Sequence, residues 1–133
     1  MSLSRILQPE GWPRPSGYSN GVLAQGRQVF VAGQVGWNPR SGEFESASLV
    51  DQAAQTLRNV LAVLAQADGR PEHIVRMTWY LTSRSEYLAH LKEIGAAYRE
   101  IMGKHFPAMT AVEVSALVEA KAKVEIEATA VIP

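Results

Sequence analysis

Apolar and polar residues alternate with a period of two near the end of the chain, in residues 108–117 and 122–132. This alternation is typical of β-strands with two chemically different faces. One face of the second stretch is apolar and consists of Val124, Ile126, Ala128, Ala130 and Ile132. The other face is polar and consists of Lys123, Glu125, Glu127 and Thr129. The short segment between the two stretches predicts a hairpin whose carboxylate-bearing face meets water, a ligand or another subunit.

Two further stretches have strand patterns. Residues 21–25, a turn at Gly26 and Arg27, and residues 28–35 predict a second hairpin, which is central because both of its faces are apolar. Residues 74–82 are rich in β-branched and aromatic side chains and predict another strand. Arg76 lies on the more polar face of that strand, where a structural ion pair with a glutamate of the C-terminal strands is the favoured interpretation.

Apolar residues at spacings of three and four predict two amphipathic helices, over residues 48–68 and from Ser83 or Ser85 to Ile101. The polar side of the first helix is predicted to face solvent and consists of Gln52, Gln55, Arg58 and Asn59. Prolines and glycines in residues 9–17 predict an extended arm. The aromatic side chain of Trp12 on this arm is interpreted as an anchor against the body of the protein.

The predicted order β-β-α-β-α-β-β indicates an α+β fold for a single domain over residues 1–133, with both helices on one face of the sheet. The uncovered face mixes Phe30 and Tyr80 with polar groups. Such a face is too apolar for water and too polar for a core, which favours self-association.

Composition narrows the possible functions. Thirteen basic and thirteen acidic residues balance, which argues against nucleic-acid and membrane partners. The chain has no cysteine, so thiol nucleophiles, thiolate metal sites and disulfides are excluded. No signal peptide and no membrane-spanning run is recognised, and we expect a cytoplasmic protein.

The sequence lacks the common catalytic motifs, and its three histidines show no metal-ligand spacing. Glu125 and Glu127 share a strand face at a separation of roughly 7 Å. They can form an acid–base pair, or they can balance the charges of Lys123 and Arg76. The residues alone therefore predict an oligomeric α+β protein with a polar cleft.

Several segments, in order along the chain, resemble the RidA family, also called YjgF or L-PSP. They are Gly17-Tyr-Ser-Asn, Val29-Phe-Val-Ala-Gly-Gln, Asn38-Pro-Arg-Ser-Gly-Glu, Gln55-Thr-Leu-Arg-Asn, Phe106-Pro-Ala, Val112-Glu-Val and Val124-Glu-Ile-Glu-Ala. The resemblance implies a chorismate-mutase-like trimer with small-molecule clefts between subunits. It also implies hydrolysis of reactive enamines and imines, such as 2-aminoacrylate, to keto acids and ammonia, without a metal or organic cofactor.

The resemblance also implies site residues. Tyr18, Thr110 and Glu125 fall on catalytic positions, and Gly33 and Ala111 line the ligand. Ala32 stands where the family often has a serine, so a hydroxyl is lost.

Met109 is the main departure from the family pattern, because the resemblance places it where the deaminases carry the arginine that binds the substrate carboxylate. A thioether has no comparable donor, so we expect 2-imino acids to bind at least ~10-fold more weakly unless Arg14 or Arg76 substitutes.

Three functions remain open at this point. The first is hydrolytic deamination of a small imine or enamine with altered scope. The second is non-catalytic binding of a neutral or apolar metabolite beside Met109. The third is an endoribonuclease or translation-inhibitor activity, which the older family label suggests and the balanced charge disfavours.

Overall fold

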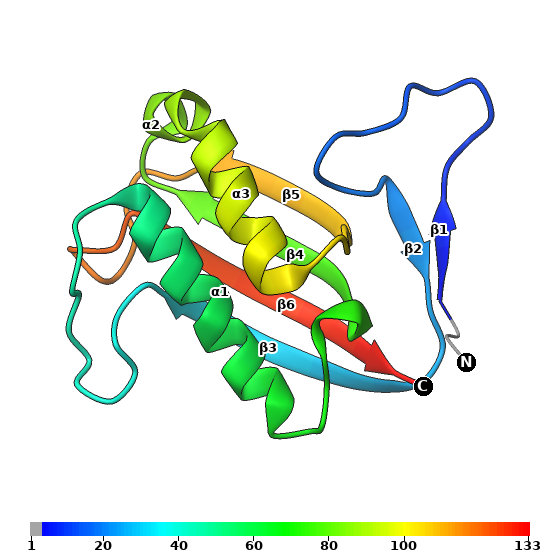
Figure 1. Ribbon diagram of the computed structural model, residues 1–133, viewed down its shortest axis with the longest axis horizontal. Helices are drawn as coiled ribbons and strands as arrows, with labels where there is room; N and C mark the ends of the chain where they lie inside the picture. Colours follow the sequence, from blue (N-terminus) through cyan, green and yellow to red (C-terminus); the bar gives the residue numbers. More distant parts are fainter. Residues whose placement is uncertain (1–3) are drawn as a thin grey trace.

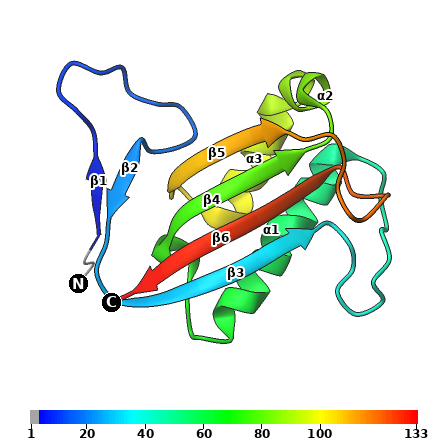
Figure 2. The same cartoon turned by 180° about the vertical axis from the view of Figure 1, so that it is seen from behind.

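The computed structural model describes residues 4–133 as a four-stranded mixed sheet, two longer helices and a two-stranded arm (Figure 1). The elements in chain order are β1 (Arg5–Leu7), β2 (Gly21–Leu23), β3 (Arg27–Val35), α1 (Leu49–Ala65), η1 (Pro71–His73), β4 (Ile74–Leu81), α2 (Arg84–Ala89), α3 (Leu91–Met102), β5 (Ala108–Glu113) and β6 (Val124–Ile132). The helices α1 and α3 lie side by side on one face of the sheet. The opposite face carries no helix from the described residues (Figure 2), so the predicted α+β arrangement is confirmed.

The sheet order β3-β6-β4-β5 shows that the predicted C-terminal hairpin is wrong. Strand β4 lies between β5 and β6, pairing parallel with the former and antiparallel with the latter. The parallel pair needs a long crossover, which α2 and α3 provide. The connection over residues 114–123 then returns the chain across the end of β4, where the Val114 N–H donates to the Leu81 carbonyl oxygen.

The predicted hairpin around Gly26 is also wrong, because β2 pairs with β1 and β3 pairs with β6. Gly26 has a φ of 148°, and a Cβ there would overlap the carbonyl oxygen of Ile132. This glycine therefore permits a close approach of two backbones. Trp12 is 59% exposed, so its interpretation as an anchor against the body is wrong too.

The core forms between the sheet and the helices, as the alternation predicts. The apolar face of β6 is buried, with Val124, Ile126 and Ala130 at 0% exposure. The first helix begins after Ser48, whose side chain accepts a hydrogen bond from the Asp51 N–H. The second predicted helix is interrupted at His90 and forms α2 and α3. No helix in residues 4–133 combines the length and apolarity that crossing a membrane requires.

Gln52 and Asn59 on α1 are buried at 1% and 4% exposure, which corrects their predicted position on the solvent side. The Gln52 amide donates to the carbonyl oxygens of Ser46 and Lys121 and accepts from the Lys123 N–H, at 3.0, 3.0 and 2.8 Å. The Asn59 amide donates to the carbonyl oxygens of Val35 and Trp37. These amides fix the loop after β3 and the loop before β6, and they thereby position the start of β6.

Candidate functional site

The strand register arranges the polar side chains of the uncovered sheet face in rows. The first row contains Ala108, Arg76, Thr129 and Phe30, on β5, β4, β6 and β3 in turn. The second row contains Thr110, Thr78 and Glu127. The third row contains Val112, Tyr80 and Glu125. Successive rows are about 7 Å apart, because neighbouring positions on one face of a strand are two residues apart.

Glu125 lies in the third row, half-buried, with its carboxylate over the backbone of Gly33. A Cβ at Gly33 would overlap that carboxylate, so the glycine provides the space that it occupies. The pairing of β3 with β6 is irregular between Val31 and Gln34, which places Ala32 and Gly33 in a bulge. No side chain or backbone N–H in residues 4–133 donates a hydrogen bond to the Glu125 carboxylate, which leaves it available to a ligand.

Tyr80 and Glu127 form a hydrogen-bonded pair across β4 and β6. The phenol donates to the Glu127 carboxylate at 3.2 Å. Partial removal from water, followed by the charge of Glu127, raises the pKa of the Tyr80 phenol. The sequence left two roles open for Glu125 and Glu127, an acid–base pair or charge balance by Lys123 and Arg76. In the described residues Glu127 accepts from Tyr80, and Lys123 pairs with Glu86.

Tyr18 is positioned by the residue that follows it. The Ser19 hydroxyl donates to the Phe106 carbonyl oxygen, and the Ser19 N–H donates to the Pro107 carbonyl oxygen at 3.0 Å. Ser19 also forms a parallel bridge with Ala108 at the start of β5. Tyr18, at 41% exposure, therefore lies beside the edge strand β5, which has no other strand on its outer side within residues 4–133.

Met109 and Ala111 lie on the opposite face of β5 from Thr110. Their register partners on β4 are Met77 and Trp79, which are buried under the helices. Met109 is half-buried and packs against the hydrophobic core, and Ala111 is exposed. The expected site residues therefore divide between the two faces of the sheet, with Thr110 on β5 and Glu125 on β6 both on the uncovered face.

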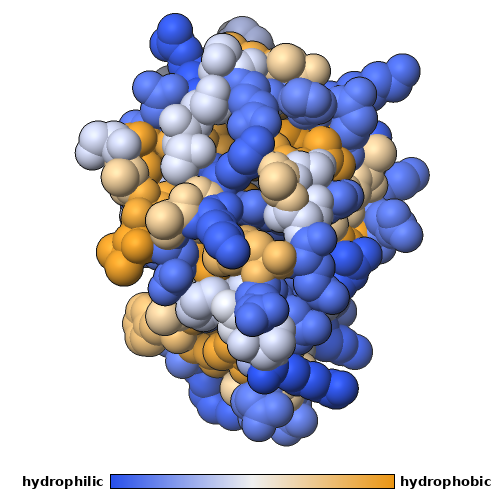
Figure 3. Space-filling view, turned by 90° about the vertical axis from the view of Figure 1, so that its left-hand side faces the viewer, coloured by the Kyte–Doolittle hydropathy of each residue, from blue (hydrophilic) through white to orange (hydrophobic). Residues whose placement is uncertain are grey.

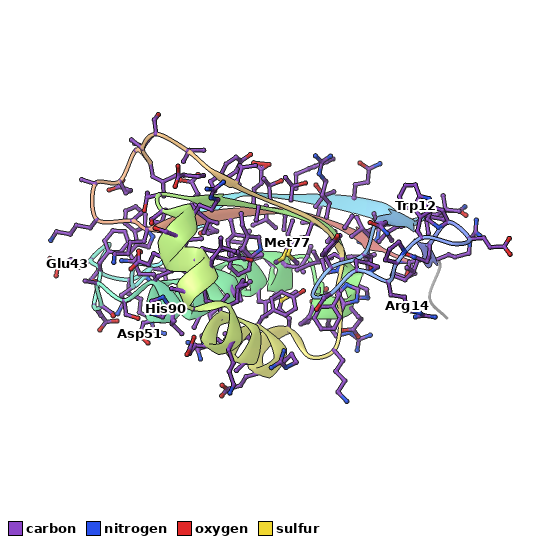
Figure 4. All side chains as sticks on the ribbon, turned by 90° about the horizontal axis from the view of Figure 1, so that it is seen from above. Trp12, Arg14, Glu43, Asp51, Met77 and His90 are labelled. Carbon is purple, nitrogen blue, oxygen red and sulfur yellow. The ribbon has the colours of Figure 1, made fainter. Side chains whose placement is uncertain are left out.

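The two arginines proposed as substitutes differ in position. Arg14 is exposed on the arm, and Figure 4 shows it at the same end of the molecule as Trp12, away from His90, whereas Met77 lies between the sheet and the helices. Arg76 lies in the first row and lines a groove of about 310 Å³ together with Phe30, Thr78, Glu127 and Thr129. In residues 4–133 the Arg76 side chain has no hydrogen bond or ion pair, so the structural ion pair favoured from the sequence is absent there.

Other surfaces show fewer features of a ligand site than the uncovered sheet face. Figure 3 shows the end of the molecule away from the arm, where apolar side chains form separate patches between hydrophilic ones. Within the described part of the chain, no three histidine, aspartate or glutamate side chains gather as a metal site requires.

A family model described as Endoribonuclease L-PSP matches residues 13–132. The chain belongs to this family. It is 32% identical to a RutC family protein of Pyrococcus horikoshii, over 96% of this chain and 98% of that protein. It is 30% identical to the human 2-iminobutanoate/2-iminopropanoate deaminase, over 97% of this chain and 90% of that protein. A Rid family protein of unknown function from Yersinia pestis, YyfB, has a similar crystal structure, with 34% identity, a TM-score of 0.84 and coverage of 98% and 99% of the two chains. The resemblance to the RidA family is confirmed.

Two features of this L-PSP family chain were not predicted from its sequence. Ser19 holds Tyr18 at the edge of the sheet, and the only sequence signal for this was its position next to Tyr18. The hydrogen bond between Tyr80 and Glu127 depends on β4 lying directly beside β6, and the sequence pattern leaves the neighbours of β4 open.

Proposed function

We propose that this protein is a cofactor-independent deaminase that hydrolyses a small imine or enamine, at sites between the subunits of a homotrimer. The observation that carries the proposal is the Glu125 carboxylate, which lies over Gly33 on the uncovered sheet face without a hydrogen-bond donor from the described residues. Relatives at about 30% identity over nearly the whole chain are named 2-iminobutanoate/2-iminopropanoate deaminases, which supports this chemistry.

The reaction requires few groups from the protein. Water adds its oxygen to the carbon of the C=N bond while the nitrogen gains a proton, which gives a carbinolamine. The C–N bond then breaks, ammonia leaves and a C=O bond forms. Glu125 of one subunit accepts the proton of the attacking water. Strand β4 separates Glu125 from β5 within one chain, so Tyr18 and the outward backbone groups at Thr110 and Ala111 of a neighbouring subunit orient the substrate. An enamine must first gain a proton at carbon to become the imine.

Self-association is supported by the uncovered sheet face. Phe30 on this face is 71% exposed and Val112 is 40% exposed, beside the Tyr80–Glu127 pair and the Arg76 groove. Contact with another copy would remove these apolar side chains from water, and it would enclose the open groove and the edge of β5. The site is therefore proposed to be complete only between chains.

The substrate scope is proposed to differ from that of the named deaminases, because Met109 stands at the position that the resemblance assigns to their carboxylate-binding arginine. A charge-assisted bond from arginine to a carboxylate contributes on the order of 1.5–3 kcal/mol. Met109 is half-buried against the hydrophobic core, and its thioether has no donor that could replace this bond.

Met109→Arg is expected to raise the rate of pyruvate and ammonia release from 2-iminopropanoate, generated in situ, by at least ~10-fold over the wild type. Met109→Leu is the matched control, because it changes the side chain without adding a donor, and it should leave the rate near the wild-type value. A wild-type rate equal to that of Met109→Arg would contradict the proposed change in substrate scope. Absence of turnover in all three proteins, for 2-imino acids and other imines alike, would favour a non-catalytic binding protein.

A further inference from the structure

We infer that Arg76 is the anion-binding residue of this site and that the ligand carries its negative charge several bonds away from the reacting C=N carbon. The inference rests on the proposed function, and it names the substrate class. Arg76 is exposed at the centre of the first row, and its side chain has no hydrogen bond or ion pair in residues 4–133. A guanidinium binds carboxylates with up to five donors and keeps its charge at every accessible pH.

The surroundings of Arg76 suit a carboxylate ligand. Thr78 and Thr129 line the groove of about 310 Å³ together with Arg76. Glu127, the acidic side chain that lines the groove, accepts the hydrogen bond of Tyr80 and makes no ion pair with Arg76. The positive charge of Arg76 is therefore available, and Phe30 provides an apolar wall for the carbon chain of a ligand.

The spacing of the rows determines which carboxylates fit. Arg76 is in the first row and Glu125 is in the third, so their Cα atoms are separated by about 13–14 Å along the strands. In a 2-imino acid the carboxylate carbon is bonded directly to the imine carbon, so the two groups together span little of this gap. An imine or enamine with three or more bonds between the two groups spans more of it. The separation of the rows therefore favours the longer ligand.

Arg14 is a weaker candidate for the same role. It is carried by the exposed loop of the arm, which is held by its own hydrogen bonds from the Gln8 side chain to the carbonyl oxygens of Trp12 and Pro13. No contact places it near Glu125 or the groove within the described chain. The structure therefore favours Arg76.

Binding of two stable isomeric ketones tests the inference without requiring turnover. In 4-oxopentanoate three bonds separate the carbonyl carbon from the carboxylate carbon, whereas in 2-oxopentanoate the two are bonded directly. Isothermal titration calorimetry is expected to show that the wild type binds 4-oxopentanoate more tightly. Arg76→Met should weaken that binding by about 10-fold and leave binding of 2-oxopentanoate nearly unchanged.

Two further variants complete the test. Arg76→Lys keeps a positive charge and should retain most of the affinity for 4-oxopentanoate, with binding that weakens as salt is added. Arg58→Met removes an exposed arginine of α1 and should bind like the wild type. Equal affinity for the two isomers, or an unchanged affinity in Arg76→Met, would overturn the inference. If Arg76→Met changes the oligomeric state, the salt dependence of the wild type is decisive. A wild-type affinity for 4-oxopentanoate that does not change with salt would then overturn the inference. Failure of the proposed deaminase activity would be seen separately. In that case the protein would still bind 4-oxopentanoate more tightly than 2-oxopentanoate, but it would release no ammonia from imines.

Discussion

Glu125→Gln is expected to lower kcat for hydrolysis of the preferred imine by about 10²- to 10⁴-fold, the range typical of a lost general base. Glutamine has nearly the shape of glutamate, so the side chain still fits over Gly33, but its amide cannot accept the proton of the attacking water. Ammonia release under saturating substrate measures the effect, and KM should change little. Glu100→Gln, on an exposed position of α3, is the matched control and should keep wild-type activity. A decrease of less than about 3-fold would show that Glu125 is not the base.

Gly33→Ala examines the same carboxylate by displacing it. Its added Cβ would overlap the Glu125 side chain, which must then leave its position over the β3 backbone. We expect a loss of at least about 10-fold in kcat, since small displacements of a reacting group are costly. Gly95→Ala is the control, because its Cβ would meet only the flexible guanidinium of Arg99, at 3.3 Å. Full activity of Gly33→Ala would mean that catalysis does not depend on the observed position of Glu125.

Gln52→Leu is expected to lower the free energy of unfolding by about 2–5 kcal/mol. The buried amide satisfies the carbonyl oxygens of Ser46 and Lys121 and the N–H of Lys123, and leucine satisfies none of them. Each buried backbone group left without a partner costs about 1–3 kcal/mol. The total is smaller than the sum of three such costs, because water reaches some of these groups when the loops move.

Urea unfolding at a fixed protein concentration measures this change, because the stability of an oligomer depends on concentration. Gln66→Leu is the matched control at the end of α1, where the side chain is exposed, and it should change the unfolding free energy by no more than about 0.5 kcal/mol. A loss below about 1 kcal/mol in Gln52→Leu would show that the loops find other partners.

The alternation of apolar and polar residues was sufficient to predict which residues of β6 are buried, because a strand with one covered face must place its apolar side chains there. Alternation does not identify the neighbouring strand. Residues 108–113 have the same pattern whether they pair with β6 or with β4, and the crossover through α2 and α3 decides for β4. The Gly26 signal was similarly ambiguous, since glycine serves both a tight turn and a close backbone approach.

The site was harder to predict than the fold. The resemblance supplied the positions of Tyr18, Met109 and Glu125, but the strand register places Met109 on the helix-covered face and Glu125 on the open one. Buried amides were missed because a polar residue on an amphipathic helix is normally interpreted as solvent-facing, and Gln52 has its partners in loops distant in sequence. The isolation of Arg76 depends on which strands neighbour β4, which the sequence pattern leaves open.

We propose that the open sheet face is an interface and that the site is completed between chains. Sedimentation equilibrium of the wild-type protein at micromolar concentration tests this assembly. We expect a single species with the mass of three chains. A single species with the mass of one chain, able to release ammonia from an imine, would contradict it.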